Sequence, residues 1–395
     1  FKLRGAYAKL KSLTAEERNR GVICASAGNH AQGVAMAARH LGVDAVVVMP
    51  AITPDIKVNA VEKLGARVII HGDDFDTACE RALEIAKQDN LTFVHPYDDP
   101  EVITGQATIA MELFRQCPSP PEYLFVCIGG GGLAAGMAIV SKYLHPETKL
   151  IGVEAAESAS MKAAVDAGGP VTLDEIGHFA EGVAVKRTGD LTYEICSEFL
   201  DDIITVDNDE ICAAVQDVYE DTRAIAEPAG VLAIAGIKRY FSEKPDNNAR
   251  VSAILSGANV NFARLRHIAE RAAVGEESEA LLGVTIPERP GSFLDFCQTV
   301  GLRGITEFNY RYSDRSDAHI FVGIALKHGM EEKSGIMEEL NRQGLPVIDL
   351  SSNDMARLHI RHMVGGRARV ENERILRFQF PERPGALLAF LQGMQ

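Results

Sequence analysis

Four consecutive glycines, Gly129, Gly130, Gly131 and Gly132, constrain the fold of this chain more than any other stretch. A continuous apolar run, residues 123–128, precedes them, and good helix formers at helical spacing follow from Leu133. The pattern predicts a buried strand, a tight glycine turn and a helix. Such a turn directs unpaired amide groups and the helix dipole at one point, which favours an anion, best a phosphate. The alternative is a turn that binds nothing.

The spacing of the glycines limits which phosphate compound this turn would bind. It matches neither GxGxxG nor GxxxxGK[ST], so a dinucleotide or a nucleoside triphosphate is not the natural ligand. The formal charge of −15, without a basic block, argues against a nucleic-acid partner. No apolar run reaches the roughly 18 residues of a membrane span, so no membrane partner is expected. The seven cysteines lack CxxC spacing, which predicts ordinary thiols and no metal site.

From residue 21 to about residue 207, short β-rich runs alternate with amphipathic helices, which predicts an α/β fold with parallel, helix-covered sheets. The predicted strands are 22–25, 45–49, 68–70, 92–94, 123–128, 150–153 and 251–255. One predicted helix ends at residue 41, and the others span residues 55–64, 75–88, 133–144, 210–222 and 229–241. With 395 residues, the chain is long enough for two or three domains.

A polar hinge at 275–279 separates this region from a second one, whose elements follow the β-α-β-β-α-β order of a ferredoxin-like domain. Its predicted elements are strand 280–286, helix 291–300, strands 306–312 and 318–326, helix 331–343 and strand 346–350. The sequence Pro-Glu-Arg-Pro-Gly occurs after residue 286 and again after residue 380, which indicates an internal repeat. The second copy stops after one helix and the chain begins without Met, so both ends look cut.

Lys2 lies in the sequence Phe-Lys-Leu-Arg-Gly at the start of the chain. A lysine between apolar residues is usually a surface side chain whose ammonium group reaches water. The alternative is a desolvated amine that forms a Schiff base with a carbonyl compound.

A second glycine-bearing turn comprises Ser26, Ala27, Gly28, Asn29 and His30. Its small polar side chains would cap a helix in any protein. The functional alternative is that the loop amides hold a substrate carboxylate while Asn29 donates a hydrogen bond to an oxygen of a cofactor. His30 is either a general base or a structural donor, and the sequence leaves its role open.

Three further polar residues have both a local and a functional interpretation. Ser256 follows the last strand of the α/β region, where its hydroxyl would bind the backbone or face a ring nitrogen. Glu227 precedes a proline at a predicted helix start, which favours an interaction with the helix dipole. Glu181 could offer a carboxylate to a cation, but one acid without further ligand spacing is a weak indication.

A phosphate cradle, an amine, an amide for a phenolic oxygen and a hydroxyl for a ring nitrogen together describe a site for pyridoxal 5′-phosphate (PLP). The chain resembles the biosynthetic threonine deaminases (threonine ammonia-lyases) of the tryptophan-synthase-β-like family of PLP enzymes. The resemblance rests on 1–7, 26–33, 129–133 and 256–259, and the tail, including 306–311, resembles the paired ACT-like regulatory domains of these enzymes. It implies a fold-type II PLP enzyme followed by ferredoxin-like domains.

The resemblance also implies a role for each motif. Lys2 carries PLP as a Schiff base and later removes the α-proton, while Gly129–Gly132 and Leu133 bind the phosphate. Asn29 meets the 3′-oxygen and Ser256 the pyridine nitrogen, and L-threonine is converted to 2-oxobutanoate and ammonia. A serine hydroxyl leaves the ring a weaker electron sink than a carboxylate would, which favours prompt loss of the β-hydroxyl group.

The tail implies feedback regulation in isoleucine biosynthesis, with isoleucine as inhibitor, valine as its antagonist and activator, and a homotetramer as the assembly. The expected domains are a catalytic region at 1–273, a first ACT-like domain at 278–365 and the start of a second at 374–395. The expected location is the cytoplasm for a bacterial protein, and an organelle stays open because a targeting segment would precede residue 1.

Other members of the same fold family would share the PLP motifs. A serine dehydratase, a serine racemase or a threonine synthase is an alternative within this family, and L-serine is an alternative substrate. The tail with two Pro-Glu-Arg-Pro-Gly sequences favours the threonine deaminase. From a different class, the chain could be a non-catalytic amino-acid sensor, but a sensor has no need of Lys2 in its full motif.

Overall fold

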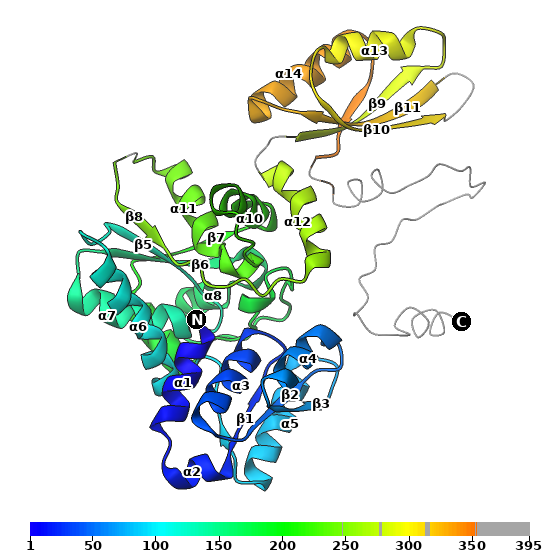
Figure 1. Ribbon diagram of the computed structural model, residues 1–395. Helices are drawn as coiled ribbons and strands as arrows, with labels where there is room; N and C mark the ends of the chain where they lie inside the picture. Colours follow the sequence, from blue (N-terminus) through cyan, green and yellow to red (C-terminus); the bar gives the residue numbers. More distant parts are fainter. Residues whose placement is uncertain (247, 276–278, 313–316, 352, 354–395) are drawn as a thin grey trace, which may run out of the picture. The chain divides into compact units, whose positions relative to one another are not determined.

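The computed structural model describes residues 1–246, 248–275, 279–312, 317–351 and 353. By their internal contacts, the described residues form one compact unit up to Phe262 and a second from Ala263 (Figure 1). This division falls at the start of helix α12 (Phe262–Gly275), whereas the sequence places the domain limit near the end of that helix. The predicted limits of the domains stay a prediction. The second Pro-Glu-Arg-Pro-Gly copy and the predicted domain at 374–395 lie outside the described residues.

The first unit contains two parallel four-stranded sheets. In the first sheet the strands run in the order β3-β2-β1-β4. Their bounds are β1 (Val22–Ala25), β2 (Ala45–Met49), β3 (Arg67–Ile70) and β4 (Thr92–Phe93). The accompanying helices are α1 (Lys2–Ser12), α2 (Ala15–Arg20), α3 (Asn29–Leu41), α4 (Asp55–Lys63) and α5 (Phe75–Gln88).

Both faces of the first sheet are covered, which explains why its central strands are continuously apolar. Cys24 and Val47 share one core cluster with residues of α1 and α3. Their neighbours Ile23 and Val46 share another cluster with residues of α5, because successive side chains of a strand point to opposite faces.

The second sheet has the strand order β7-β6-β5-β8, and all its pairs are parallel. Its strands are β5 (Tyr123–Cys127), β6 (Lys149–Ala155), β7 (Asp202–Val206) and β8 (Val251–Ala253). The helices of this part are α6 (Pro100–Gln116), α7 (Gly132–Leu144), α8 (Ser160–Ala167), α9 (Asp190–Phe199), α10 (Asn208–Thr222) and α11 (Leu232–Glu243). Short 3₁₀ turns occur at η1 (Ala156–Ser158), η2 (Glu181–Val183) and η3 (Pro228–Gly230).

Helix α1 packs closely against helix α3. A side chain at Gly33 would lie only 3.0 Å from the backbone of Lys2 and Leu3, so the two helices approach each other at backbone distance. This packing fixes the position of the first turn of α1, from which the side chain of Lys2 extends.

Besides most of α12, the second unit contains an antiparallel sheet with two helices on one face. The strands β9 (Glu279–Pro287), β10 (Ile305–Tyr312), β11 (Asp317–Ala325) and β12 (Val347–Asp349) have the order β10-β11-β9-β12. The helices are α13 (Ser292–Val300) and α14 (Gly329–Arg342). Alternate residues of β9 and β11 share one apolar core with both helices, for example Leu282, Ile320, Phe296 and Leu340.

The predicted α/β architecture and the β-α-β-β-α-β order of the second unit are confirmed. Helix α11 begins at Leu232 because Pro228–Gly230 form a 3₁₀ turn, so the predicted start at residue 229 is wrong. Helix α6 was missed, although Asp99 caps it by accepting hydrogen bonds from the amides of Glu101 and Val102 (2.9 and 3.2 Å). A capping aspartate followed by proline is a helix-start pattern that the sequence does contain.

Candidate active site

One pocket collects residues from both sheets of the first unit and from the start of α1. It lies at the carboxyl ends of strands β1, β5 and β8, where parallel sheets usually bind ligands. It is lined by Phe1, Lys2, Asn29, Tyr97, Cys127, Gly129, Gly130, Gly131, Gly132, Leu133, Gly182, Val183, Glu227, Ala229 and Ser256. The motifs that the sequence singled out therefore meet in one place, apart from Glu181 and from Ser26, Ala27, Gly28 and His30 of the second glycine turn.

The four-glycine turn forms one wall of this pocket. Gly131 has a left-handed backbone (φ 94°), and a side chain at Gly130 would overlap the ring of Tyr97. Within the described residues no side chain caps the start of α7, so the amides of the turn are left for a ligand. The carbonyl of Gly130 accepts a hydrogen bond from Thr192 Oγ1 (2.7 Å), which fixes the turn from behind. A cradle of backbone amides with space only for glycine fits a phosphate group.

Lys2 extends from the first turn of α1 into the same pocket. Its Nζ donates a hydrogen bond to the carbonyl oxygen of Pro96 at 2.7 Å. Burial disfavours the ammonium form and lowers the pKa of Lys2 from 10.5 to about 8. An amine that is partly uncharged near neutral pH is a competent nucleophile toward an aldehyde. The surface alternative for this side chain is therefore not supported.

The turn 26–30 contributes one side chain to the pocket. The amide of Gly28 donates to Ser26 Oγ (3.2 Å), and a side chain at Gly28 would meet no described atom within 4 Å. The backbone amides of Ser26, Ala27 and Gly28 thus lie in a turn with open space beside it, while Asn29 reaches the pocket itself. Their predicted contact with a substrate carboxylate stays a prediction.

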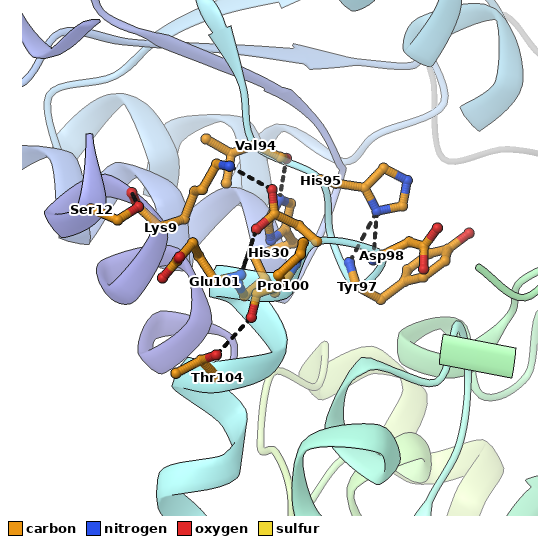
Figure 2. A network of polar contacts seen from close by, with 12 residues as sticks. Lys9, Ser12, His30, Val94, His95, Tyr97, Asp98, Pro100, Glu101 and Thr104 are labelled. Atoms are coloured by element: carbon orange, nitrogen blue, oxygen red, sulfur yellow. Dashed lines mark hydrogen bonds and ion pairs between the residues drawn. The ribbon is translucent and has the colours of Figure 1, made fainter. Parts of the chain in front are cut away.

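The side chain of His30 points into the protein interior. Its ring is 3% exposed, and Nε2 donates to the carbonyl oxygen of Val94 at 2.9 Å (Figure 2). Burial lowers the pKa of His30 to about 3, so the ring is neutral at ordinary pH. Of the two alternatives left by the sequence, the structure supports the structural donor, and only the backbone amide of His30 stays a candidate for the substrate.

Ser256 bonds the backbone and also lines the pocket, and its predicted role at a ring nitrogen stays a prediction. Its hydroxyl donates weakly to the carbonyl of Ala229 (3.4 Å) and also lines the pocket. It accepts a hydrogen bond from the thiol of Cys127 at 3.4 Å. Burial raises the pKa of the Cys127 thiol, which keeps this group protonated and able to donate.

The predicted role of Glu227 at a helix dipole stays a prediction. Within the described residues its side chain makes no capping hydrogen bond to η3, and its Oε1 instead accepts from Asn29 Nδ2 at 2.6 Å. Glu181, considered for a cation, pairs with Lys57 Nζ at 2.7 Å. Among the described residues, no group of three or more His, Cys, Asp or Glu side chains is arranged to hold a metal ion.

The segment 95–98 is the part of the site that the sequence did not reveal. His95 Nδ1 accepts hydrogen bonds from the amides of Tyr97 and Asp98 at 3.3 and 2.8 Å, which folds the segment into a tight turn (Figure 2). The Tyr97 ring covers the glycine turn, and its hydroxyl donates to the carbonyl of Arg187 (3.1 Å). The only sequence indication was a polar, proline-bounded run directly after a strand.

Asp98 ties the same segment to the start of α9. Its two carboxylate oxygens accept hydrogen bonds from the amides of Asp190 and Thr192, both at 3.1 Å. Thr192 also donates to Gly130, and the carbonyl of Pro96 accepts from Lys2. The consecutive residues 96–98 therefore connect the Lys2 amine, the glycine turn and α9. The segment therefore sets the distance between the amine and the phosphate cradle.

Comparison with known proteins supports this interpretation of the site. Residues 1–257 match the family model described as "Pyridoxal-phosphate dependent enzyme", and residues 270–360 match "C-terminal regulatory domain of Threonine dehydratase". The biosynthetic L-threonine dehydratase IlvA of Escherichia coli K12 is 55% identical over 395 residues, which are 100% of this chain and 77% of that protein. The chloroplastic biosynthetic threonine dehydratase 1 of Solanum lycopersicum is 46% identical over 394 residues, 100% of this chain and 65% of that protein.

Solved structures agree with the sequence comparisons. The processed form of threonine deaminase isoform 2 from Solanum lycopersicum superimposes with a TM-score of 0.67 at 45% identity, over 69% of this chain and 79% of that one. Maize serine racemase gives a TM-score of 0.63 at 29% identity, over 67% of this chain and 81% of that one. The predicted fold-type II architecture and the family resemblance are confirmed. The chain belongs to the family of PLP-dependent enzymes and, within it, to the biosynthetic threonine dehydratases that carry a C-terminal regulatory domain.

Proposed function

We propose that this chain deaminates L-threonine to 2-oxobutanoate and ammonia with PLP as cofactor. The observation that carries the proposal is the placement of the Lys2 amine, with its pKa near 8, in one pocket with a glycine cradle and Ser256. Bound PLP supplies the electron sink that makes the α-proton of an amino acid acidic. The 55% identity with the Escherichia coli L-threonine dehydratase supports threonine as the substrate.

Each motif then has a defined task. The amides of Gly129–Gly132 and Leu133 would hold the phosphate, and Lys2 Nζ would carry the cofactor. The Lys2 amine would also accept the α-proton of the substrate, which its lowered pKa permits near neutral pH. Asn29 and Ser256 would orient the ring through its 3′-oxygen and its nitrogen. The open turn at 26–30 would hold the substrate carboxylate, although its Ser26 amide already donates to the carbonyl of Val48 at 3.1 Å.

The absorption spectrum of the PLP-loaded protein, recorded before and after addition of threonine, tests this function. We expect a band of covalently bound cofactor that changes on addition, with formation of 2-oxobutanoate. Lys2→Ala should remove the band and lower the rate at least about a thousandfold, because a lost catalytic nucleophile costs that much or more. Lys11→Ala, an exposed lysine of the same helix, is the control.

Two results would contradict this proposal. One is a normal cofactor band and turnover in Lys2→Ala, and the other is a loaded wild-type protein that does not consume threonine. The ratio of kcat/KM for L-threonine and L-serine decides between a threonine and a serine dehydratase. D-serine formation from L-serine would instead indicate a racemase.

We further propose that isoleucine inhibits the enzyme through the second unit, that valine opposes it, and that the enzyme is a homotetramer. The match of residues 270–360 to a regulatory domain supports regulation by a small effector. A pocket beside the start of α13 supports an amino acid as that effector. It is lined by Pro287, Arg289, Ser292, Asp295, Gln298, Thr299, Glu339, Gln343, Gly344 and Leu345.

The chemistry of this second pocket suits a zwitterion. Ser292 is 3% exposed, and its Oγ has no hydrogen-bond partner among the described residues. Arg289 offers a cation for a carboxylate, and Asp295 an anion for an ammonium group. Arg289→Ala should raise the isoleucine concentration for half inhibition about tenfold while kcat is unchanged, since a charged hydrogen bond contributes about that much. Unchanged inhibition would exclude this pocket, and the absence of any isoleucine effect on the wild type would exclude the regulation.

A further inference from the structure

Asn29 and Glu227 form a short hydrogen bond inside the catalytic pocket. Asn29 Nδ2 donates to Glu227 Oε1 at 2.6 Å, and both side chains line the pocket. They come from different parts of the first unit, since Asn29 starts α3 after β1 and Glu227 precedes η3. Glu227 is only 8% exposed, and a carboxylate in such a position is costly unless a specific partner compensates it.

The backbone of Glu227 is held on both sides of its side chain. Its backbone amide donates to Gly257 O (3.1 Å), and its carbonyl accepts from the amide of Gly230 (2.7 Å). Its Oε1 lies directly over Gly257, where an added side chain would overlap it. The backbone that carries this carboxylate is therefore fixed, and the carboxylate itself lies beside Gly257, where Asn29 bonds it.

A fixed acceptor removes the rotational freedom of the Asn29 amide. The amide group has two N–H donors and one carbonyl acceptor in a plane. When one N–H is held by Glu227, the directions of the second N–H and of the carbonyl are set. A charged acceptor also polarises the amide, which makes the second N–H a better donor.

We propose that Glu227 is a positioning residue for the cofactor, which acts by holding Asn29 so that its second N–H meets the 3′-oxygen of PLP. This inference rests on the proposed role of Asn29. The alternative is that Glu227 only fills space beside Gly257 and keeps the pocket in shape.

Two variants separate these possibilities. Glu227→Gln keeps the shape of the side chain and an acceptor but removes the charge, whereas Glu227→Ala removes both. We expect the PLP dissociation constant to rise a few-fold in the first and roughly ten- to hundredfold in the second, as for loss of a charged hydrogen bond. The absorption band of bound PLP should shift in both, because the hydrogen bond to its phenolic oxygen changes.

Glu210→Gln is the matched control. Burial raises the pKa of the Glu210 carboxyl, as it does that of Glu227, but the Glu210 carboxylate accepts from the amide of Asp207 at the start of its own helix, α10. It is not among the residues that line the pocket. Both the PLP affinity and the band of bound PLP should stay as in the wild type.

A double-mutant cycle with Asn29→Ala tests whether Glu227 acts through Asn29. If it does, Glu227→Gln changes little further in the Asn29→Ala background, in both affinity and spectrum. Wild-type affinity and spectrum in Glu227→Gln would leave only the space-filling role and overturn the inference, as would additive effects of the two substitutions. If Asn29→Ala itself changed neither quantity, the proposed role of Asn29 would fail as well, while the Lys2→Ala experiment would still report on the reaction.

Discussion

The two glycine turns of the catalytic unit look alike in sequence but differ in their surroundings. Each connects a buried parallel strand to a helix, β5 to α7 and β1 to α3. At Gly130 an added side chain would overlap Tyr97, and at Gly132 it would lie 2.9 Å from the backbone of the same residue. At Gly28 it would meet no described atom within 4 Å. One turn is enclosed by protein, and the other faces open space.

This difference indicates which ligand each turn suits. The enclosed turn has one conformation, fixed by Tyr97 and by the hydrogen bond from Thr192 to Gly130, which suits a cofactor that stays bound. The open turn is held by hydrogen bonds from the Ser26 amide to Val48 and from the Gly28 amide to Ser26, but open space lies beside Gly28, which suits a substrate that enters and leaves. In the turn 129–132, glycine is therefore required because no side chain would fit. In the turn 26–30, glycine leaves space through which a ligand can enter.

The largest effect is expected from Gly130→Ala. The added methyl group would overlap the Tyr97 ring, so either the turn or the segment 95–98 must shift. A displacement of about 1 Å costs roughly a hundredfold in a preorganised site, and PLP affinity and turnover should fall by at least that factor. Fluorescence titration with PLP and a threonine deamination assay measure both.

Removal of the obstructing ring provides the control for this prediction. Tyr97→Ala in the Gly130→Ala background should recover part of the PLP affinity, because the truncated side chain makes room for the methyl group. A Gly130→Ala protein with normal PLP affinity would show that the turn is not enclosed as described.

An intermediate effect is expected from pH. The pKa of Lys2 is lowered by burial to about 8, so its reactive uncharged form gains about tenfold per pH unit below that value and levels off above it. The rate of covalent PLP incorporation into the apoprotein should follow this curve. Binding of the PLP phosphate by the enclosed glycine turn should not follow this curve, because the turn has no titrating side chain. Stopped-flow absorption at several pH values separates the two phases, and a covalent phase that is constant from pH 6 to 9 would contradict the lowered pKa.

The smallest effect is expected from Gly28→Ala. The new methyl group has open space, so thermal stability should change by less than about 0.5 kcal/mol, as for most surface substitutions. PLP affinity should be unchanged, while KM for threonine should rise a few-fold if the turn binds the substrate carboxylate. Thermal denaturation, PLP titration and steady-state kinetics give the three values, and a loss of PLP affinity like that of Gly130→Ala would remove the distinction between the turns.

Much of the fold was determined by local pattern in the sequence. Continuous apolar strands such as Ala45–Met49 indicated a helix-covered parallel sheet, and the β-α-β-β-α-β order of elements from residue 280 indicated a ferredoxin-like domain. The glycine turn was predictable because only glycine tolerates backbones such as that of Gly131. These features depend on neighbours in the chain, and a sequence displays such neighbours directly.

Only the tertiary structure decided the contacts between distant segments. Asn29 and Glu227 are 198 residues apart, and nothing local to Glu227 distinguishes a pocket carboxylate from a helix-dipole partner. His30 was ambiguous until its ring was found bonded to Val94 in the interior. The segment 95–98 was not predicted as part of the site, because its role depends on its contacts with Lys2, the glycine turn and α9. The sequence thus determined which backbone turns exist, whereas packing decided which side chains meet, since burial and hydrogen-bond partners across a pocket are properties of the whole fold.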